Sequence, residues 1–292
     1  MTENVELRVD ARATLGEGPS WDEANRLLYW VDIEGKKVFV YNPAVNENKT
    51  IEMDQMVGAI VPRSGNEAVI AMEKGLQFMN TKTGELHPIS DPESDIQENR
   101  FNDGKCDPEG RFWAGTMSFD AKEGNGSLYC LETDQNITKK IGNVTISNGL
   151  AWSPDNRYMY YIDTPTRKVD RYEYDLETGD INNPVTVVEI PEGQGNPDGM
   201  TIDAEGNLWI AHWGGARISV WNPENGELQK IIPVPALNVT SCVFGGDELN
   251  ELYITTASTG MTEEDLRKYP HAGGLFKLKT TVKGSPTYSY KG

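Results

Sequence analysis

The chain has 292 residues, of which 37% are hydrophobic and 25% are charged, a composition that supports a folded core and argues against disorder. Its 45 acidic side chains outnumber 27 basic ones, so the formal net charge is -18 at pH 7. Affinity for phosphate depends on Lys and Arg, so this excess of acid argues against nucleic acid or an anionic membrane as a partner.

The first residues lack the basic and apolar regions of a secretory signal peptide, and no apolar run approaches the roughly 20 residues that cross a bilayer. The three cysteines, Cys106, Cys130 and Cys242, form no C-x-x-C pair. A disulfide framework and a zinc–cysteine site are therefore not expected. These features predict a cytoplasmic protein that does not bind membranes.

In chain order, residues 5–9 alternate apolar and polar side chains, which predicts a half-exposed strand. A pattern that recurs six times follows, consisting of a short apolar segment, a turn, and a strand of aromatic or branched residues. In the first copy these parts are residues 17–21, 22–26 and 27–32. The six copies begin at Glu17, Val57, Asp103, Asn148, Asp198 and Thr240, which lie 40 to 50 residues apart. A drifting period of this length, made of strands, is typical of β-propellers.

Each copy continues with a third strand and, in most cases, a more polar fourth strand such as residues 48–52 or 228–232. The sixth copy reaches the end of the chain after its third strand. We therefore expect residues 5–9 to supply its outer strand and to close the ring without a free sheet edge. Residues 262–266 are the one candidate turn of helix. The predicted fold is an all-β, six-bladed β-propeller formed by residues 1–292 as a single domain, with the last blade closed by the N-terminal strand.

The innermost strands of a propeller line its central channel, so the first residues of the six copies should converge there. Four of these positions offer carboxylate or amide oxygen, namely Glu17, Asp103 (with Asn102 before it), Asn148 and Asp198. Such a ring of oxygens suits one hard divalent cation. Because adjacent strand residues point to opposite faces, only one of Asn102 and Asp103 is expected to face the channel. The alternative is a plain scaffold propeller, in which Asp-Gly and Asn-Gly pairs only mark turns.

Other catalytic signatures are missing from the sequence. It contains no Gly-x-Ser-x-Gly elbow, P-loop or Gly-x-Gly-x-x-Gly motif. A zinc site of three histidines would require His87, His212 and His271, the whole complement of the chain, to converge. The oxygen-rich ring is therefore the leading candidate site.

Seven segments stand in a characteristic order and spacing: residues 15–19, 100–105, 114–117, 147–152, 197–200, 240–246 and 271–277. Together they resemble the family of regucalcin (senescence marker protein) and the gluconolactonases, across essentially the whole chain. The resemblance implies a six-bladed propeller that binds one divalent metal ion through Glu17, Asn148 and Asp198. Calcium is the preferred ion, with zinc, magnesium and manganese as alternatives.

The resemblance also implies roles around the metal. Arg100 and Asn102 would contact the hydroxyl groups of a sugar, with Asn102 either at the metal or just beyond it. Asp120 occupies a position that is a substrate-contacting Glu in some relatives, and here the side chain is one methylene shorter. His212 belongs to a segment familiar among bacterial lactonases of the family, where it either lines the pocket or is simply packed.

The predicted function is metal-dependent hydrolysis of a small-molecule sugar lactone in the central channel by a monomer. The metal would polarise the lactone carbonyl, and Asp198 is the candidate general base for the attacking water. Two alternatives stay open at this stage. One is hydrolysis of organophosphate triesters, and the other is a non-enzymatic, calcium-binding regulatory protein.

Overall fold

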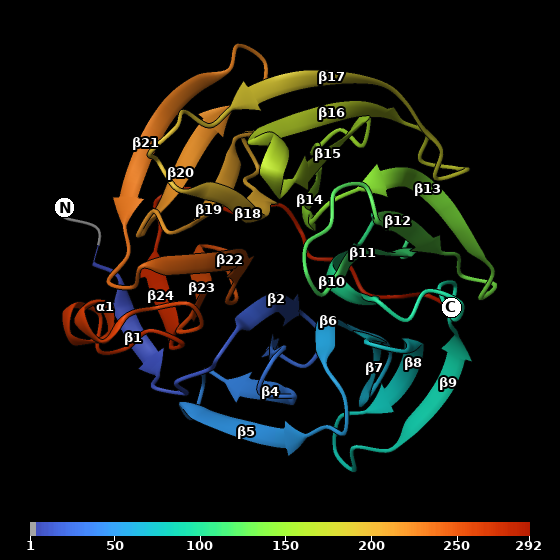
Figure 1. Ribbon diagram of the computed structural model, residues 1–292, viewed down its shortest axis with the longest axis horizontal. Coiled ribbons are helices and arrows are strands. Elements are labelled where there is room, and N and C mark those ends of the chain that lie inside the picture. The colour runs from blue at the N-terminus through green and yellow to red at the C-terminus, as the bar shows by residue number, and fades with distance from the viewer. Residues whose placement is uncertain (1–3) are drawn as a thin grey trace.

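The structure is a computed structural model that describes residues 4–292. These residues form six four-stranded antiparallel sheets arranged in a ring, seen end-on in Figure 1. In the first five sheets the strands pair in sequence order, beginning with the strand nearest the axis. The prediction of an all-β, six-bladed propeller is confirmed.

The first three blades use successive groups of four strands. Blade 1 comprises β2 (Gly16–Asp22), β3 (Leu27–Asp32), β4 (Lys37–Asn42) and β5 (Glu47–Glu52). Blade 2 comprises β6 (Val57–Pro62), β7 (Glu67–Met72), β8 (Gly75–Asn80) and β9 (Leu86–Ser90). Blade 3 comprises β10 (Asn99–Cys106), β11 (Phe112–Ser118), β12 (Gly126–Leu131) and β13 (Ile137–Val144).

The next blades follow the same plan until the chain ends. Blade 4 comprises β14 (Ser147–Trp152), β15 (Tyr158–Asp163), β16 (Lys168–Tyr174) and β17 (Ile181–Glu189). Blade 5 comprises β18 (Asn196–Ile202), β19 (Leu208–Trp213), β20 (Arg217–Asn222) and β21 (Glu227–Pro233). Blade 6 comprises β22 (Asn238–Gly245), β23 (Glu251–Ala257), β24 (Leu275–Lys279) and β1 (Glu6–Val9).

The N-terminal strand closes the ring as predicted. β1 pairs antiparallel with β24, placing Glu6 opposite Lys277 and Leu7 opposite Phe276. In Figure 1 the blue first strand accordingly lies beside the red last strand. This pairing covers the outer edge of β24, which would otherwise expose unpaired backbone groups.

Burial falls from the axis to the rim. β6 is buried at every position and β7 at every position but its first, so both read as almost continuous apolar runs. β5, at the rim, is exposed or half-buried throughout. The core lies between neighbouring blades: Val31 of blade 1, for example, shares one apolar cluster with Ile60 and Ile70 of blade 2. Each blade is thus held by the burial of its faces against two neighbours, at roughly 25 cal/mol per Å² of apolar surface.

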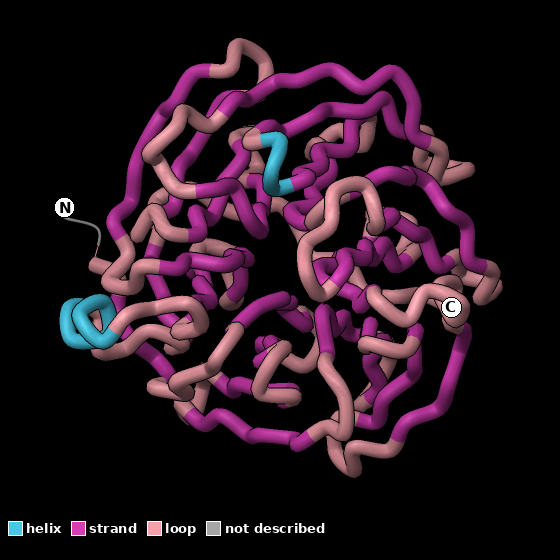
Figure 2. The backbone as a smooth tube through the Cα atoms, in the orientation of Figure 1, coloured by secondary structure: helices cyan, strands magenta, loops and turns pink. Residues whose placement is uncertain are grey.

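Helical structure among the described residues is confined to short segments (Figure 2). The helix predicted near residues 262–266 is α1 (Glu263–Lys268), where the Thr262 hydroxyl accepts from the Asp265 backbone N–H and Asp265 reciprocates. A 3₁₀ turn (Thr164–Thr166) lies closer to the axis. No helix in this part of the chain has the length and apolarity that crossing a membrane requires.

The C-terminal tail crosses one face of the propeller, visible as the red segment behind the inner strands in Figure 1. The Ser285 N–H donates to the Ile202 carbonyl of blade 5, and the Tyr290 N–H donates to the Pro62 carbonyl of blade 2. A cavity of about 30 Å³ between tail and inner strands has Lys105, Thr201 and Val243 in its lining. The tail therefore covers one end of the ring of inner strands.

Candidate functional site

All six inner strands carry a shift of register against the second strand of their blade, near the residue that begins each sequence copy. In β2 the shift lies between Glu17 and Ser20, and in β14 between Asn148 and Leu150. The corresponding shifts in the other inner strands follow Val57, Phe101, Pro197 and Val239. A β-bulge re-aims side chains that a regular strand would alternate between its faces. Because the bulge recurs in every blade, the residues beside it share a backbone geometry that a regular strand does not have.

Glycines beside the bulges allow neighbouring inner strands to approach closely. A Cβ atom on Gly149 would come within 2.8 Å of the Asp198 carbonyl oxygen in the next blade. One on Gly199 would come within 2.1 Å of Ser241 Oγ in the blade after that. These Asn-Gly and Asp-Gly pairs are therefore not turns. They lie within strands and keep the ring narrow.

The carboxyl groups of Glu17 and Asp198 lie in hydrogen-bonding contact, although they come from blades 1 and 5. Both side chains are buried. Burial, together with the charge of Asp103, raises the pKa of Glu17 to about 8, and burial and the charge of Glu17 raise the pKa of Asp198 well above its usual range. The Gly18 backbone N–H, 2.9 Å from Glu17 Oε2, offsets only part of this effect. Without a cation, the two groups share a proton more readily than they carry two negative charges.

Two buried amides adjoin this pair. Asn102 Nδ2 donates to the Ser147 carbonyl at 2.8 Å and to Asn148 Oδ1 at 3.2 Å. Asn148 Nδ2 in turn donates to Thr164 Oγ1 at 2.8 Å, and the Thr164 hydroxyl donates to the Pro197 carbonyl at 2.8 Å. Because its NH₂ group is committed to Thr164, Asn148 turns its carbonyl oxygen inward. The chain of bonds links the amides to the residue directly before Asp198.

Arg100 brings a buried cation to the same region. Its Nη1 donates to Asn102 Oδ1 at 2.8 Å and to the Phe101 carbonyl at 3.0 Å. Burial lowers the pKa of the guanidinium, while the charges of Glu34 and Glu17 raise it. The attraction between Arg100 and Glu17 also lowers the pKa of Glu17, so the two residues face a common space.

The expectation that only one of Asn102 and Asp103 faces the channel stays a prediction. Asn102 contacts Asn148, whereas the charge of Asp103 raises the pKa of both Glu17 and Asp198. The alternation of a regular strand does not hold here, because the register of β10 shifts between Phe101 and Gly104. Regular alternation therefore does not decide which of the two side chains faces the channel.

Two further residues of this region were not singled out from the sequence. Lys105 is held by a 2.6 Å hydrogen bond from its Nζ to the Met200 carbonyl, and its charge lowers the pKa of Asp103, which burial raises. Thr164 holds the amide of Asn148, as described above. Lys105 could have been predicted, because it belongs to the Asn-Asp-Gly-Lys segment at the start of the third copy. Thr164, in the loop after β15, belongs to no recurring motif and could not have been predicted from the sequence.

Asp120 and His212 take less central places. Asp120 is exposed on the loop after β11, and its Oδ1 accepts from Ser118 Oγ at 2.9 Å. Met117 pairs with Arg100, so this loop leaves blade 3 at the end where Arg100 lies. His212 is buried and packed: its Nδ1 lies 2.9 Å from the Gln194 carbonyl, and its Nε2 lies 2.6 Å from Ser219 Oγ. Burial lowers the pKa of His212 to about 4, so the ring is neutral at pH 7.

The residues at the centre fit a hard cation by their chemistry. Within residues 4–292 no three His, Cys, Asp or Glu side chains are placed to hold a metal ion. The predicted set of Glu17, Asn148 and Asp198 differs in kind, since it joins two carboxylates to one amide oxygen. Two buried carboxylates in contact repel one another, and a divalent cation between them would remove that repulsion. Oxygen donors suit calcium, magnesium or manganese.

Comparisons with known proteins identify the family of the chain. The profile of the family described as SMP-30/Gluconolactonase/LRE-like region matches residues 15–258. A Bacillus subtilis (strain 168) protein, provisionally named sugar lactone lactonase YvrE, is 42% identical over 98% of both chains. Regucalcin of Danio rerio is 39% identical over 99% of this chain and 98% of its own. The crystal structure of a calcium-binding protein, regucalcin, from Agrobacterium tumefaciens str. C58 superposes with a TM-score of 0.95 at 28% identity, covering 99% of this chain and 98% of that one. With its matched profile, near full-length relatives and shared fold, the chain belongs to the SMP-30/gluconolactonase/LRE-like family.

Proposed function

We propose that this protein is a metal-dependent lactonase that opens the ring of a sugar lactone at the centre of the propeller. The observation that carries the proposal is the contact between the buried carboxyl groups of Glu17 and Asp198, beside the amide of Asn148 and the guanidinium of Arg100. Membership of a family that includes gluconolactonases supports the reaction class.

Glu17, Asn148 and Asp198 would hold the cation. A bound divalent cation supplies a Lewis acid that polarises the lactone carbonyl and takes up charge as the tetrahedral intermediate forms. Calcium is the proposed ion on the strength of the all-oxygen donor set and of the relative described as calcium-binding. Zinc, magnesium and manganese are alternatives that metal replacement would distinguish.

The side chains of the protein then supply orientation and proton transfer. Asp198 is the proposed general base: its carboxylate orients a water molecule toward the lactone carbonyl and accepts the proton that this water loses. A bound cation would lower the pKa of the Asp198 carboxylate and weaken it as a base, so its main contribution is to orient the water molecule.

Arg100 and Asn102 are proposed to bind the hydroxyl groups of the sugar. Arg100 uses only Nη1 in its two bonds to Phe101 and Asn102, which leaves Nη2 available as a donor toward a substrate. Asn102 itself is held on both sides, by Arg100 at its oxygen and by Ser147 and Asn148 at its nitrogen. Besides its proposed contact with the sugar, Asn102 therefore also positions Arg100 and Asn148. Asp120 is proposed as a further substrate contact from the loop at the same end of blade 3.

The experiment that tests the proposal measures proton release from a panel of aldonolactones after chelation and again with each divalent metal restored. Turnover that is lost on chelation and returns with one metal is the expected result. Cation binding without turnover of any lactone would overturn the proposal in favour of a calcium-binding regulatory protein. The description of the Agrobacterium relative as a calcium-binding protein is consistent with that alternative. A parallel panel of phosphotriesters tests the organophosphate alternative.

A further inference from the structure

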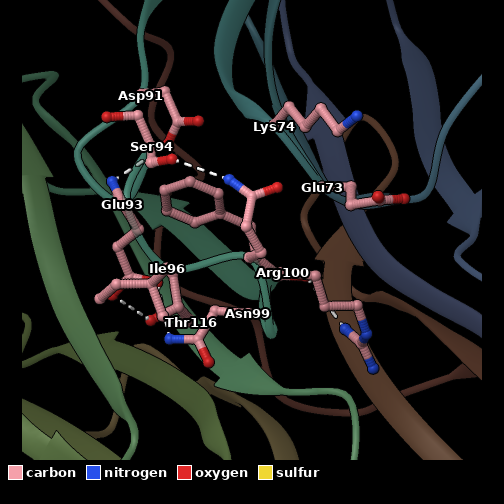
Figure 3. A pocket seen from close by; sticks show the side chains of 11 residues that line it. Glu73, Lys74, Asp91, Glu93, Ser94, Ile96, Asn99, Arg100 and Thr116 are labelled. Atoms are coloured by element: carbon pink, nitrogen blue, oxygen red, sulfur yellow. Dashed lines mark hydrogen bonds between the residues drawn. The ribbon is translucent and has the colours of Figure 1, made fainter.

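A second hollow lies beside the candidate site, between blades 2 and 3 (Figure 3). Its volume is about 400 Å³, within the range of small-molecule binding sites. The turn between β7 and β8 forms one wall, the loop between β9 and β10 forms the other, and the start of β10 with part of β11 completes it. The polar members of the lining include Glu73, Lys74, Asp91, Glu93, Asn99 and Arg100.

The base of this hollow is rigid and polar. The buried carboxylate of Glu93 accepts from Asn99 Nδ2 at 2.8 Å, from Thr116 Oγ1 at 2.9 Å and from Tyr129 OH at 3.0 Å. Asn99 is fixed in addition by a reciprocal pair of bonds with Asn125. A ligand that enters would meet groups whose orientation is already set, so it would order few side chains on binding.

The charges of the residues that line the hollow indicate which kind of ligand it would bind. Three carboxylates, of Glu73, Asp91 and Glu93, outnumber the two cations of Lys74 and Arg100. A phosphorylated or otherwise anionic group is therefore disfavoured. An acyl chain is disfavoured too, because Ile96 and Phe101 are the only apolar side chains in this lining. Carboxylates and amides accept hydrogen bonds from hydroxyl groups, so a neutral polyhydroxylated ligand fits best.

Arg100 connects this hollow with the centre of the ring. The same side chain lines the hollow and donates to Asn102, which contacts Asn148. A lactone held by Arg100 would therefore lie next to the hollow that Glu73 and Lys74 also line. We propose that the hollow is a subsite for a second sugar, and that the preferred substrates are lactones of disaccharides. This inference rests on the proposed lactonase function.

The test compares kcat/KM for cellobiono-1,5-lactone, glucono-1,5-lactone and 6-phosphoglucono-1,5-lactone. We expect the disaccharide lactone to exceed the monosaccharide lactone by about tenfold, and the phosphorylated lactone to be the poorest of the three. Ser94 lies exposed at the hollow, so Ser94→Trp would fill it. The substitution should lower the ratio of the first two values by at least about fivefold. Ser64→Trp, at an exposed turn between β6 and β7, is the matched control and should leave the ratio unchanged.

Binding is measured separately from turnover. Calorimetry with cellobionate and gluconate should show tighter binding of the disaccharide acid, and Ser94→Trp should abolish that difference. Hydrolysis of glucono-lactone with no preference for the disaccharide, or a preference that survives Ser94→Trp, overturns the subsite while leaving the lactonase proposal in place. Preferred cellobionate binding without hydrolysis of any lactone would instead overturn the lactonase and retain the subsite.

Discussion

The carboxyl groups of Glu17 and Asp198 lie in hydrogen-bonding contact at the centre of the propeller, although they come from the inner strands of blades 1 and 5. Both groups are buried, and in the absence of a cation their repulsion costs stability.

Removing either carboxylate should have opposite effects on activity and on stability. Asp198→Asn and Glu17→Gln should each lower kcat/KM for a lactone by at least about 100-fold, since both reach the reacting centre in the proposed function. In the presence of a chelator, however, each variant should melt at or above the Tm of the parent, because the buried repulsion is gone. Glu23→Gln, at an exposed turn, is the control for a lost negative charge. Full activity in either site variant would refute the assignment.

Cation binding should release protons. In the cation-free protein the pKa of Glu17 is raised to about 8 and that of Asp198 is raised as well, so at pH 7 the pair retains a proton that a cation would displace. Calorimetric enthalpies of binding should therefore depend on the ionisation enthalpy of the buffer, and the apparent affinity should rise with pH up to about 8. Enthalpies that are independent of the buffer at pH 7 would contradict the shared proton.

The raised pKa of Glu17 also determines how the stability of the cation-free protein depends on pH. The pKa of Glu17 is about 8 in the folded protein and 4.5 as its ordinary value, so the folded state binds more protons between these limits. The proton on Glu17 therefore stabilises the folded state fully below pH 4.5, and this stabilisation is lost as the pH rises through about 8. Thermal melts of the parent and of Glu17→Gln, compared across this window, should converge at low pH and separate at high pH.

Thr164 should act as a positioning residue for Asn148. Thr164→Val removes the oxygen that accepts from Asn148 Nδ2 and so frees the amide to rotate. We expect cation affinity and activity to fall together by about tenfold, as for other groups that orient a metal ligand. Thr166→Val, in the same 3₁₀ turn but exposed, is the control. A lower Tm with unchanged cation affinity would assign Thr164 a purely structural role.

His212 should make the folded protein less stable as the pH falls below neutrality. Its Nδ1–H donates to the Gln194 carbonyl, and its Nε2 accepts from Ser219, whose oxygen is also bonded by Trp221 Nε1. The pKa falls from 6.5 to about 4 on folding, so the unfolded state binds more protons in between. As pH falls through this window, stability should decline by an amount on the order of 3 kcal/mol. His212→Gln should lose this dependence, and urea titrations between pH 4 and 7 would measure it.

The sequence by itself predicted the blades, because strand propensity, turn residues and a period in the forties are local properties that recur along the chain. It also predicted the closure by residues 5–9, since a final blade that lacks its outer strand needs a partner. The equivalence of Glu17, Asn148 and Asp198 was visible as well, from their matching places in successive copies. The roles of these residues, the bound metal, the monomeric state and the cytoplasmic location stay predictions.

The tertiary structure decided what happens at the bulges. Strand alternation predicted that only one of Asn102 and Asp103 would face the channel, but the register of β10 shifts between Phe101 and Gly104, so regular alternation does not hold there. Which backbones meet around the ring determines the contact between Glu17 and Asp198, the bond from Asn148 Nδ2 to Thr164 and the packing of His212. That is set by how six blades close on one another, and no local stretch of sequence contains it.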